Sequence, residues 1–327
     1  MASARATVII KMNAKTRVGV VGVGYLGRIH ARIYAGMDNV ELVGVVDSHA
    51  ETAQAVAEEL GCAQFSTPAD LVDKIDAVSI VVPTSYHLQV AKPFLDAGIH
   101  MLMEKPLAPT YEESLQLVEQ AEMSSGIFQV GHLERFNAGV MALAERVSKP
   151  KFLEVHRLGT FVERATDVDV VTDLMIHDID IVMSLVQSEI ASIAASGLAV
   201  LTDHIDIANA RLEFTNGAVA NVTASRVSNR QHRRIRVFEE KHYYGLNYVD
   251  QQLELVTAKP SAEPGKRDEI VAEQIAIEPK QPLNAELAEF IESVNTRKSP
   301  LVTGRVGLEA VRVAHIIKEK IDACLSK

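Results

Sequence analysis

Three residues in this sequence carry side chains suited to proton transfer. Lys105 lies in the tripeptide Glu104-Lys105-Pro106, and Asp173 and His177 lie four residues apart. A neutral imidazole accepts a proton near neutral pH, and an ammonium group stabilises an oxygen that becomes negative. Lys105, His177 and Asp173 are therefore the candidate catalytic residues of a reaction at a hydroxyl or carbonyl oxygen.

Each of these residues also fits a structural role. Asp173, His177 and Asp180 fall on one stripe of a predicted helix, Thr172–Leu185, that is otherwise apolar. Such polar groups need partners or a ligand, but an Asp173–His177 pair that only stabilises the helix meets that need equally well. A metal site is disfavoured, because ligands at i and i+4 need a third that no nearby spacing supplies. A lysine after a strand is by itself more often a solvated surface residue.

A glycine-rich turn points to dinucleotide binding. The motif Gly22-Val-Gly24-Tyr25-Leu26-Gly27 follows a predicted strand, Arg17–Val21, and opens a predicted helix, Tyr25–Gly36. In that context the glycines allow a tight turn, the approach of a pyrophosphate and close packing of helix on strand. Asp47 ends the next predicted strand, where its carboxylate accepts the ribose hydroxyls and repels a 2′-phosphate. The pattern predicts NAD rather than NADP, while FAD uses the same glycine fingerprint.

Two further segments fall where open α/β sheets bind ligands, outside the carboxyl ends of strands. Val82-Pro83-Thr84 ends and follows the predicted strand Ala77–Val82, with His87 one turn into the next helix, and Glu104-Lys105-Pro106 follows the predicted strand Ile99–Met103. The expected cofactor-binding residues are Gly22, Gly24, Tyr25, Leu26, Gly27, Asp47, Pro83, Thr84, His87, Glu104 and Lys105.

The elements that position these residues change character midway. After a tail, 1–15, residues 16–130 alternate helical patterns with β-branched runs typical of parallel strands buried on both faces. Within them, Thr110-Tyr-Glu-Glu113 predicts a capping box at the start of a helix. In residues 131–327 the runs alternate polar and apolar residues, and Asn216-Gly217 is a strong hairpin signal. The predicted fold class is α/β, with an N-terminal doubly wound (Rossmann) parallel sheet and a C-terminal α+β domain on a mostly antiparallel sheet. The C-terminal helices, at about Asn284–Thr296 and Gly304–Ala323, are candidates for packing back on the first domain.

Composition excludes several classes of protein. The 327 residues include 33 Lys and Arg against 43 Asp and Glu, so the formal net charge is −10. This acidic balance argues against nucleic-acid or anionic-membrane partners. The basic segment 226–236 is better explained as a strand with a solvated, substrate-facing or subunit-facing side.

The sequence also carries expectations about location. It has no apolar run long enough for a membrane helix and no signal-like start, so we expect a cytoplasmic protein. Cys62 and Cys324, the only cysteines, fit a reducing compartment and provide neither a disulfide framework nor a zinc site.

Taken together, the glycine motif with Asp47, the Glu104-Lys105-Pro106 tripeptide and the Asp173–His177 pair are specific. Through them the chain resembles the glucose-fructose oxidoreductase, inositol dehydrogenase and MocA family of NAD(P)-dependent enzymes, from about Arg17 to Ala323. The resemblance implies a Rossmann domain, then an α/β domain whose large open sheet forms homodimers or homotetramers. It also implies oxidation or reduction at a sugar, cyclitol or nucleotide-linked sugar, with Lys105 and His177 as the catalytic pair. Asp173 would hold the histidine or the substrate.

One departure from the family narrows the resemblance. Many members have a glycine pair shortly before the Asp-x-x-x-His pattern, where this chain reads Asp167-Val-Asp169-Val-Val-Thr-Asp173. Together with Gly131-His-Leu-Glu-Arg-Phe-Asn137, this variant looks like a subgroup that includes UDP-N-acetylglucosamine 3-dehydrogenases of lipid A precursor synthesis. The expected substrate-binding residues are Arg135, Asn137, Arg164, Asp173 and His177. Arg135, Arg157 and Arg164 are suited to holding a diphosphate, although each also fits a surface ion pair.

These features predict an NAD-dependent dehydrogenase that acts on a secondary hydroxyl of a sugar, such as C3 of UDP-N-acetylglucosamine. We expect His177 to take the hydroxyl proton and Lys105 to hold the oxygen, with the roles exchanged if Lys105 is desolvated enough to lose its proton. An inositol or free-sugar dehydrogenase is the alternative enzyme. A non-catalytic NAD-sensing or sugar-sensing protein is the alternative of another class, against which the presence of both Lys105 and His177 argues.

Overall fold

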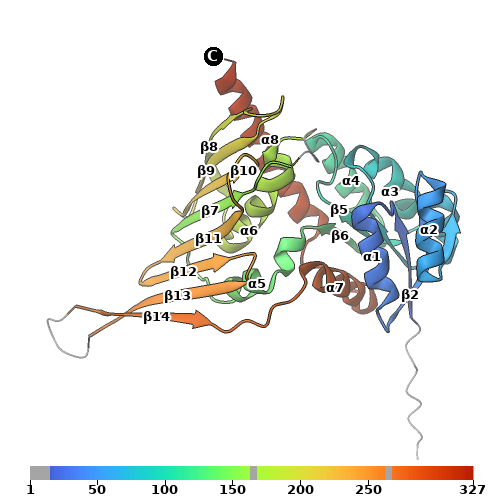
Figure 1. Cartoon of the computed structure of the whole chain (residues 1–327), viewed down its shortest axis with the longest axis horizontal. Coiled ribbons are helices and arrows are strands. Elements are labelled where there is room, and N and C mark those ends of the chain that lie inside the picture. The colour runs from blue at the N-terminus through green and yellow to red at the C-terminus, as the bar shows by residue number, and fades with distance from the viewer. Residues whose placement is uncertain (1–14, 163–167, 262–266, 327) are drawn as a thin grey trace, which may run out of the picture.

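Two sheets of different type organise the molecule. The computed structural model describes residues 15–162, 168–261 and 267–326. Within these residues, a six-stranded parallel sheet and an eight-stranded, mostly antiparallel sheet lie side by side (Figure 1). The predicted fold class is confirmed. No helix among the described residues is long and apolar enough to cross a membrane.

The parallel sheet and its helices form the N-terminal half. Its strands are β1 (Thr16–Val21), β2 (Val40–Val46), β3 (Ala63–Phe65), β4 (Ala77–Ile80), β5 (His100–Glu104) and β6 (Phe128–Gly131), in the order β3-β2-β1-β4-β5-β6. They are joined through α1 (Tyr25–Ala35), α2 (Ala50–Leu60), α3 (His87–Asp96), α4 (Tyr111–Met123) and the 3₁₀ turns η1 (Pro68–Lys74) and η2 (Thr84–Tyr86). The central strands are buried on both faces, as their unbroken apolar runs predict. The strand order reverses between β1 and β4, which is where open α/β sheets bind ligands.

The larger sheet forms the C-terminal half. Its strands are β7 (Phe152–Leu158), β8 (Ile190–Leu198), β9 (Ile207–Phe214), β10 (Val219–Ser225), β11 (His232–Glu239), β12 (His242–Asn247), β13 (Gln252–Lys259) and β14 (Glu269–Ile275), in the order β14-β13-β12-β11-β7-β10-β9-β8. Only the β7–β10 pair is parallel among the pairings of these strands. The Asn216-Gly217 hairpin joins β9 to β10, with Gly217 at a φ of 82°.

One face of this sheet is covered by helices. Burial alternates along β7, β9 and β10, as expected for a sheet with one face in the core. The covered face packs against α5 (Ala138–Ala144), α6 (Ile176–Val186) and part of α8 (Gly304–Leu325). The 3₁₀ turn η3 (Leu133–Phe136) precedes α5, and the π-helical turn η4 (Val171–Met175) leads into α6.

The last two helices connect the halves. Leu287 and Phe290 of α7 (Pro282–Thr296) lie in the same core cluster as Val18 and Val20 of β1. The start of α8 lies so close to β6 that a Cβ on Gly307 would come within 2.8 Å of the Val130 side chain. Farther along, α8 contacts β8 and α6. Both helices therefore pack on the N-terminal half, and α8 packs on both halves.

The structure differs from the predicted elements in three ways. The strands β6, β8, β12, β13 and β14 and the helix α5 were not predicted, since they are short or carry charged and small residues among the apolar ones. The helix predicted at Thr172–Leu185 begins as the π-helical turn η4. The two-way capping box expected at Thr110 is found at Thr67 and Asp70, while Thr110 accepts a hydrogen bond from the Glu113 amide at 3.2 Å.

Candidate active site

The glycine turn between β1 and α1 lies where the strand order reverses. Gly22 has a φ of 83°, and a Cβ there would lie 2.5 Å from the Val81 carbonyl oxygen. A Cβ on Gly27 would lie 1.8 Å from the Gly22 carbonyl oxygen, so neither position tolerates a side chain. Gly24, by contrast, borders open space, and it leaves the N-terminus of α1 without a side-chain cap. Free amides beside open space fit the pyrophosphate of a dinucleotide.

Asp47 is fastened to this turn. Its Oδ2 atom accepts a hydrogen bond from the Val23 amide at 2.8 Å, and its Oδ1 atom accepts one from the His49 amide at 2.9 Å. The carboxylate is therefore oriented beside the glycine turn, where an adenosine ribose would lie. Tyr25 and Leu26 form the first turn of α1, and Tyr25 is exposed.

His87 contacts the backbone of the loop that follows β4. Its Nε2 atom contacts the Val82 carbonyl oxygen at 3.0 Å, and its Nδ1 atom contacts the Leu107 carbonyl oxygen at 3.1 Å. The ring is buried, and burial lowers its pKa. Both ring nitrogens therefore lie against backbone carbonyl oxygens, and the contact of His87 with the cofactor stays a prediction. Pro83 and Thr84 remain near the surface at the start of η2.

Glu104 supports the residue that follows it. Its carboxylate is buried at the end of β5, with Oε1 3.3 Å from His30 Nε2. Its Oε2 atom accepts a hydrogen bond from the Lys105 amide at 3.3 Å. A carboxylate held in this way orients the backbone at Lys105, and a direct contact of Glu104 with the cofactor stays a prediction.

Lys105 joins the two halves of the molecule. Its Nζ atom donates a hydrogen bond to the Asp173 carbonyl oxygen at 2.8 Å and lies 3.5 Å from Asp173 Oδ1. We expected Asp173 to hold either His177 or the substrate, and no bond between Asp173 and His177 is found among the described residues. The reason is local, because Asp173 lies in the π-helical turn η4, whose wider winding changes the stacking of residues four apart.

His177 is a buried, neutral imidazole near this ammonium group. Burial, followed by the charges of Lys105 and Arg157, holds its pKa well below the usual value. Its Nδ1 atom is enclosed and has no hydrogen-bond partner in the described part of the chain. The ring meets that of His132 edge to face, with centroids 6.3 Å apart. His132, which follows the unpredicted strand β6, was missed as a neighbour of the site.

The expected substrate-binding residues are only partly free. Arg135 Nη1 lies 3.2 Å from Asp180 Oδ1. Asn137 caps α5 by accepting a hydrogen bond from the Gly139 amide, and it donates one to the Tyr248 carbonyl oxygen at 3.0 Å, so its amide group is structural. Arg164 lies outside the described residues.

Arg157 is also not available to a diphosphate. Its guanidinium is buried and donates two hydrogen bonds of 2.8 Å to Asp178 and one of 2.9 Å to Glu134. The expectation that Arg157 binds substrate is therefore wrong. Sequence reasoning missed the partners because both carboxylates lie on other elements, η3 and α6.

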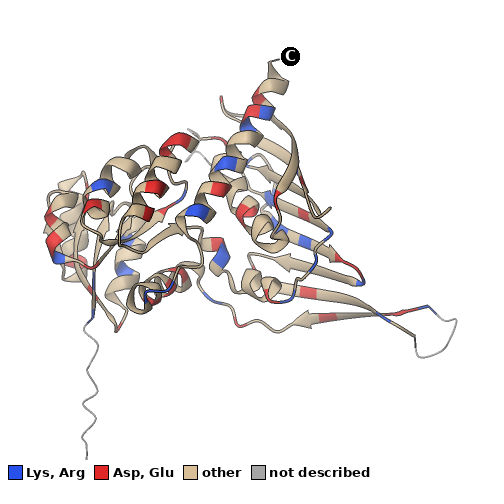
Figure 2. Cartoon of the chain, turned by 180° about the vertical axis from the view of Figure 1, so that it is seen from behind, with Lys and Arg blue, Asp and Glu red and all other residues tan. Residues whose placement is uncertain are grey.

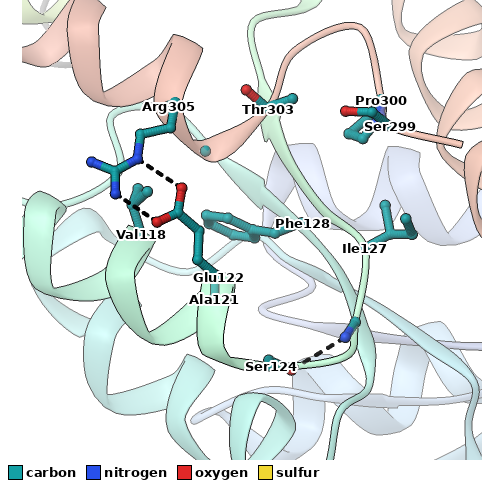
Figure 3. Close-up of a pocket in the computed structure, with 12 residues that line it drawn as sticks. Val118, Ala121, Glu122, Ser124, Ile127, Phe128, Ser299, Pro300, Thr303 and Arg305 are labelled. Atoms are coloured by element: carbon teal, nitrogen blue, oxygen red, sulfur yellow. Dashed lines mark hydrogen bonds and ion pairs between the residues drawn. The ribbon is translucent and has the colours of Figure 1, made fainter.

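A cavity elsewhere in the molecule does not contain these residues. It has a volume of about 500 Å³ and lies between α4, the segment before β6 and the start of α8 (Figure 3). The ion pair between Arg305 Nε and Glu122 Oε1, 2.7 Å long, borders it. None of the predicted catalytic or cofactor-binding residues lines this cavity. No group of His, Cys, Asp and Glu in the described ranges is arranged to hold a metal ion.

Known proteins are similar to this chain in sequence and in fold. Residues 16–132 match the sequence model described as an oxidoreductase family with an NAD-binding Rossmann fold, and residues 145–244 match the GFO/IDH/MocA C-terminal domain. UDP-N-acetylglucosamine 3-dehydrogenase of Acidithiobacillus ferrooxidans is 35% identical over 315 residues, which cover 95% of this chain and 99% of the relative. A solved structure of the enzyme of that name from the same organism has a TM-score of 0.89, with 96% of this chain and 99% of the other covered. The scyllo-inositol 2-dehydrogenase (NAD⁺) of Bacillus subtilis is 30% identical over 238 residues, 66% of this chain and 69% of the relative.

Proposed function

The chain belongs to the GFO/IDH/MocA family of NAD-binding oxidoreductases, and from this premise we propose that it oxidises a secondary hydroxyl of a nucleotide-linked sugar. The observation that carries the proposal is that Lys105 of the N-terminal half donates a hydrogen bond to the Asp173 carbonyl oxygen, four residues before His177, and that its charge helps to lower the pKa of the buried His177 imidazole. The name of the 35% identical relative supports UDP-N-acetylglucosamine as the substrate and C3 as the carbon oxidised.

The proposed mechanism divides the work between His177 and Lys105. NAD, held by the glycine turn and Asp47, supplies the hydride acceptor when it is bound. His177 accepts the hydroxyl proton, and we assign this to Nε2 because Nδ1 is enclosed. Lys105 donates a charge-assisted hydrogen bond to the oxygen as negative charge develops on it. Asp173 holds the ammonium group in place before the substrate hydroxyl reaches it.

The division of labour among domains and copies is also proposed. Residues 16–130 bind NAD, and residues 131–327 bind the substrate and form a homodimer or homotetramer through the large sheet. The uncovered face of that sheet supports this, because the Phe238 ring lies tilted against those of Phe152 and Tyr243, with centroids 5.8 Å and 5.1 Å apart. The three rings form a partly exposed aromatic cluster. A cytoplasmic role in lipid A precursor synthesis is part of the same proposal.

A panel of substrates tests the activity. The purified chain is incubated with NAD and, in turn, UDP-N-acetylglucosamine, UDP-glucose, N-acetylglucosamine, glucose and myo-inositol, and NADH is followed by absorbance. We expect NADH with UDP-N-acetylglucosamine and a product with two hydrogens fewer. NADH with inositol or free sugars alone would favour the second candidate, which the similarity to scyllo-inositol 2-dehydrogenase supports. No NADH with any compound would contradict both.

A further inference from the structure

Arg233 differs from Lys105, Arg135 and Arg157 around the candidate site because its side chain has no paired carboxylate in residues 15–162, 168–261 and 267–326. Lys105 is paired with Asp173, and Arg135 is paired with Asp180. Arg157 is paired with both Asp178 and Glu134. The described part of the chain provides the Arg233 guanidinium with neither a hydrogen bond nor an ion pair within 4.0 Å, whereas the Arg233 backbone carbonyl oxygen accepts a hydrogen bond from the Tyr248 amide.

The position of Arg233 places it at the catalytic end of the sheet. It lies on β11 directly opposite Arg157 of β7, on the face that the helices cover. Ile235, two residues farther along β11, is fully buried on that same face. Arg157 in turn binds Asp178, the residue after His177. Arg233 is itself partly exposed, and the charges of Asp173 and Asp178 at the start of α6 act on it, so its guanidinium is available to a ligand at this end of the sheet.

Electrostatics agree with this placement. Burial and the charge of Arg157 lower the pKa of Arg233, while Glu134, Asp178 and Asp173 act in the opposite direction. The Arg233 charge also contributes to lowering the pKa of His177. An arginine stays charged at neutral pH, so this site holds a partly desolvated cation whose N–H groups have no acceptor among the residues that the structure describes.

We propose that Arg233 binds the phosphate-bearing part of the substrate and makes the site select phosphorylated sugars over neutral ones. This inference rests on the proposed function, since it concerns the same site. The planar fork of a guanidinium donates two parallel hydrogen bonds to an oxyanion. Arg157, which the sequence suggested for this task, is committed to buried carboxylates, whereas Arg233 is not. The shared chemistry is an oxyanion attached to a sugar, and the 35% identical relative, named for a UDP-sugar, indicates a diphosphate rather than a carboxylate.

Calorimetric titration tests the assignment independently of turnover. The full chain with NADH bound is titrated with UDP, UDP-N-acetylglucosamine, glucuronate and N-acetylglucosamine. Arg233→Gln removes the charge, and Arg233→Lys keeps the charge but loses the fork. Arg230→Gln is the matched control, because Arg230 is a nearby exposed arginine of the loop before β11.

We expect Arg233→Gln to weaken the binding of UDP and of UDP-N-acetylglucosamine by about 10-fold to 100-fold. The UDP affinity of Arg233→Lys should lie between those of Arg233→Gln and the unchanged chain, and the UDP affinity of Arg230→Gln should equal that of the unchanged chain. The affinity for NADH should stay constant in all variants. With a nucleotide sugar that the chain oxidises, the weaker binding should raise KM, while kcat changes by no more than a few-fold.

Three results would overturn the inference. The first is that Arg233→Gln binds UDP as tightly as the unchanged chain does. The second is that the unchanged chain does not bind UDP, and the third is that it binds glucuronate more tightly than UDP. Failure of the proposed function looks different, because a chain that oxidises no nucleotide sugar can still bind UDP through Arg233. In that case the Arg233-dependent binding of UDP supports the oxyanion site, while the substrate panel has already rejected the activity.

Discussion

At the scale of single residues, the contact between Lys105 and Asp173 does two things. It holds the ammonium group in one place, and it fixes the end of β5 against the turn that leads into α6. The partner atom is a backbone carbonyl oxygen, so the bond depends on the path of η4 as well as on the side chain of Asp173. The ammonium group is thereby positioned before any substrate binds, which reduces the ordering needed during the reaction.

His177→Ala tests the proposed base. Because His177 would accept the hydroxyl proton, the variant should lose about 10² to 10⁴ in kcat. NAD affinity should be unchanged, since the glycine turn lies on β1 and α1. Steady-state rates and a fluorescence titration with NADH measure the two quantities. His315→Ala, at a half-exposed position on α8, is the control, and full turnover in His177→Ala would show that another group takes the proton.

Asp47→Ser tests cofactor preference. The carboxylate is expected to accept the ribose hydroxyls and to repel a 2′-phosphate. Loss of a hydrogen bond to a charged group costs about 1.5 to 3 kcal/mol, so KM for NAD should rise by about tenfold or more and NADP should become usable. Rates with both cofactors measure the change, and Glu51→Gln, at an exposed position in α2, is the control. An unaltered ratio would mean that Asp47 only holds the turn through Val23 and His49.

At the scale of elements, the buried arginine Arg157 ties three of them together. It extends from β7 to Asp178 of α6 and to Glu134 of η3, and the Tyr248 ring lies 5.3 Å from its guanidinium carbon. Since α6 carries His177 and η3 carries Arg135, this network sets the orientation of both elements. Its value is in positioning, because buried ion pairs often contribute little net stability relative to apolar residues of the same size.

Arg157→Met tests the network. The variant leaves Asp178 and Glu134 buried without their cation, which typically costs about 3 to 5 kcal/mol of unfolding free energy. Urea denaturation followed by circular dichroism measures the loss. Arg211→Met removes an exposed arginine paired with Glu213 on β9 and should change the stability far less. Equal losses in the two variants would show that the Arg157 network is not a cooperative structural unit.

At the scale of the whole molecule, the charged residues along the helices and the titratable residues of the interior are arranged differently. Acidic and basic positions are interleaved along the helices of both halves (Figure 2). The titratable groups in the interior, in contrast, include several histidines that burial keeps neutral. Burial also lowers the pKa of His100, to about 4. The fold therefore couples its stability to pH through its core.

Acidification should destabilise the protein. His87, His132 and His177 titrate at lower pH in the folded chain than in the unfolded chain, whose imidazoles have a pKa near 6.5. Between the folded-state and unfolded-state pKa values of these histidines, the unfolded chain binds more protons than the folded chain. The stabilising contribution of the neutral histidines is therefore present above about pH 6.5 and is lost as the pH falls below it. We expect the unfolding free energy to fall by a few kcal/mol between about pH 7.5 and pH 5. Urea midpoints at several pH values measure this.

Glu286 opposes the histidines and provides a control. Burial and the nearby charges of Glu104 and Glu289 raise its pKa well above the usual value. Its folded-state carboxyl therefore gains a proton at higher pH than in the unfolded chain, which favours the folded state as the pH falls. Glu286→Gln removes this effect, so its loss of stability on acidification should be steeper. A stability that stays level from about pH 7.5 to pH 5 in both proteins would contradict the assignment of neutral buried histidines.

Local features were predictable because they depend on neighbouring residues. The parallel strands, the glycine turn with Asp47 and the Asn216-Gly217 hairpin follow from apolar periodicity and from backbone angles that favour glycine. Lys105 and His177 could be selected by residue type and by resemblance to a family, and the comparisons confirm that family.

The tertiary structure alone decided which side chains meet. Lys105 and Asp173 are 68 residues apart, and Asn137 and Tyr248 are 111 residues apart. Periodicity carries no information about such pairs, because they depend on strand order and on how α6 docks against the N-terminal half. Because Asp173 lies in a π-helical turn, it accepts a hydrogen bond from Lys105 and does not pair with His177. For the same reason, only the fold could distinguish Arg157, enclosed by carboxylates, from Arg233 directly opposite it on the next strand.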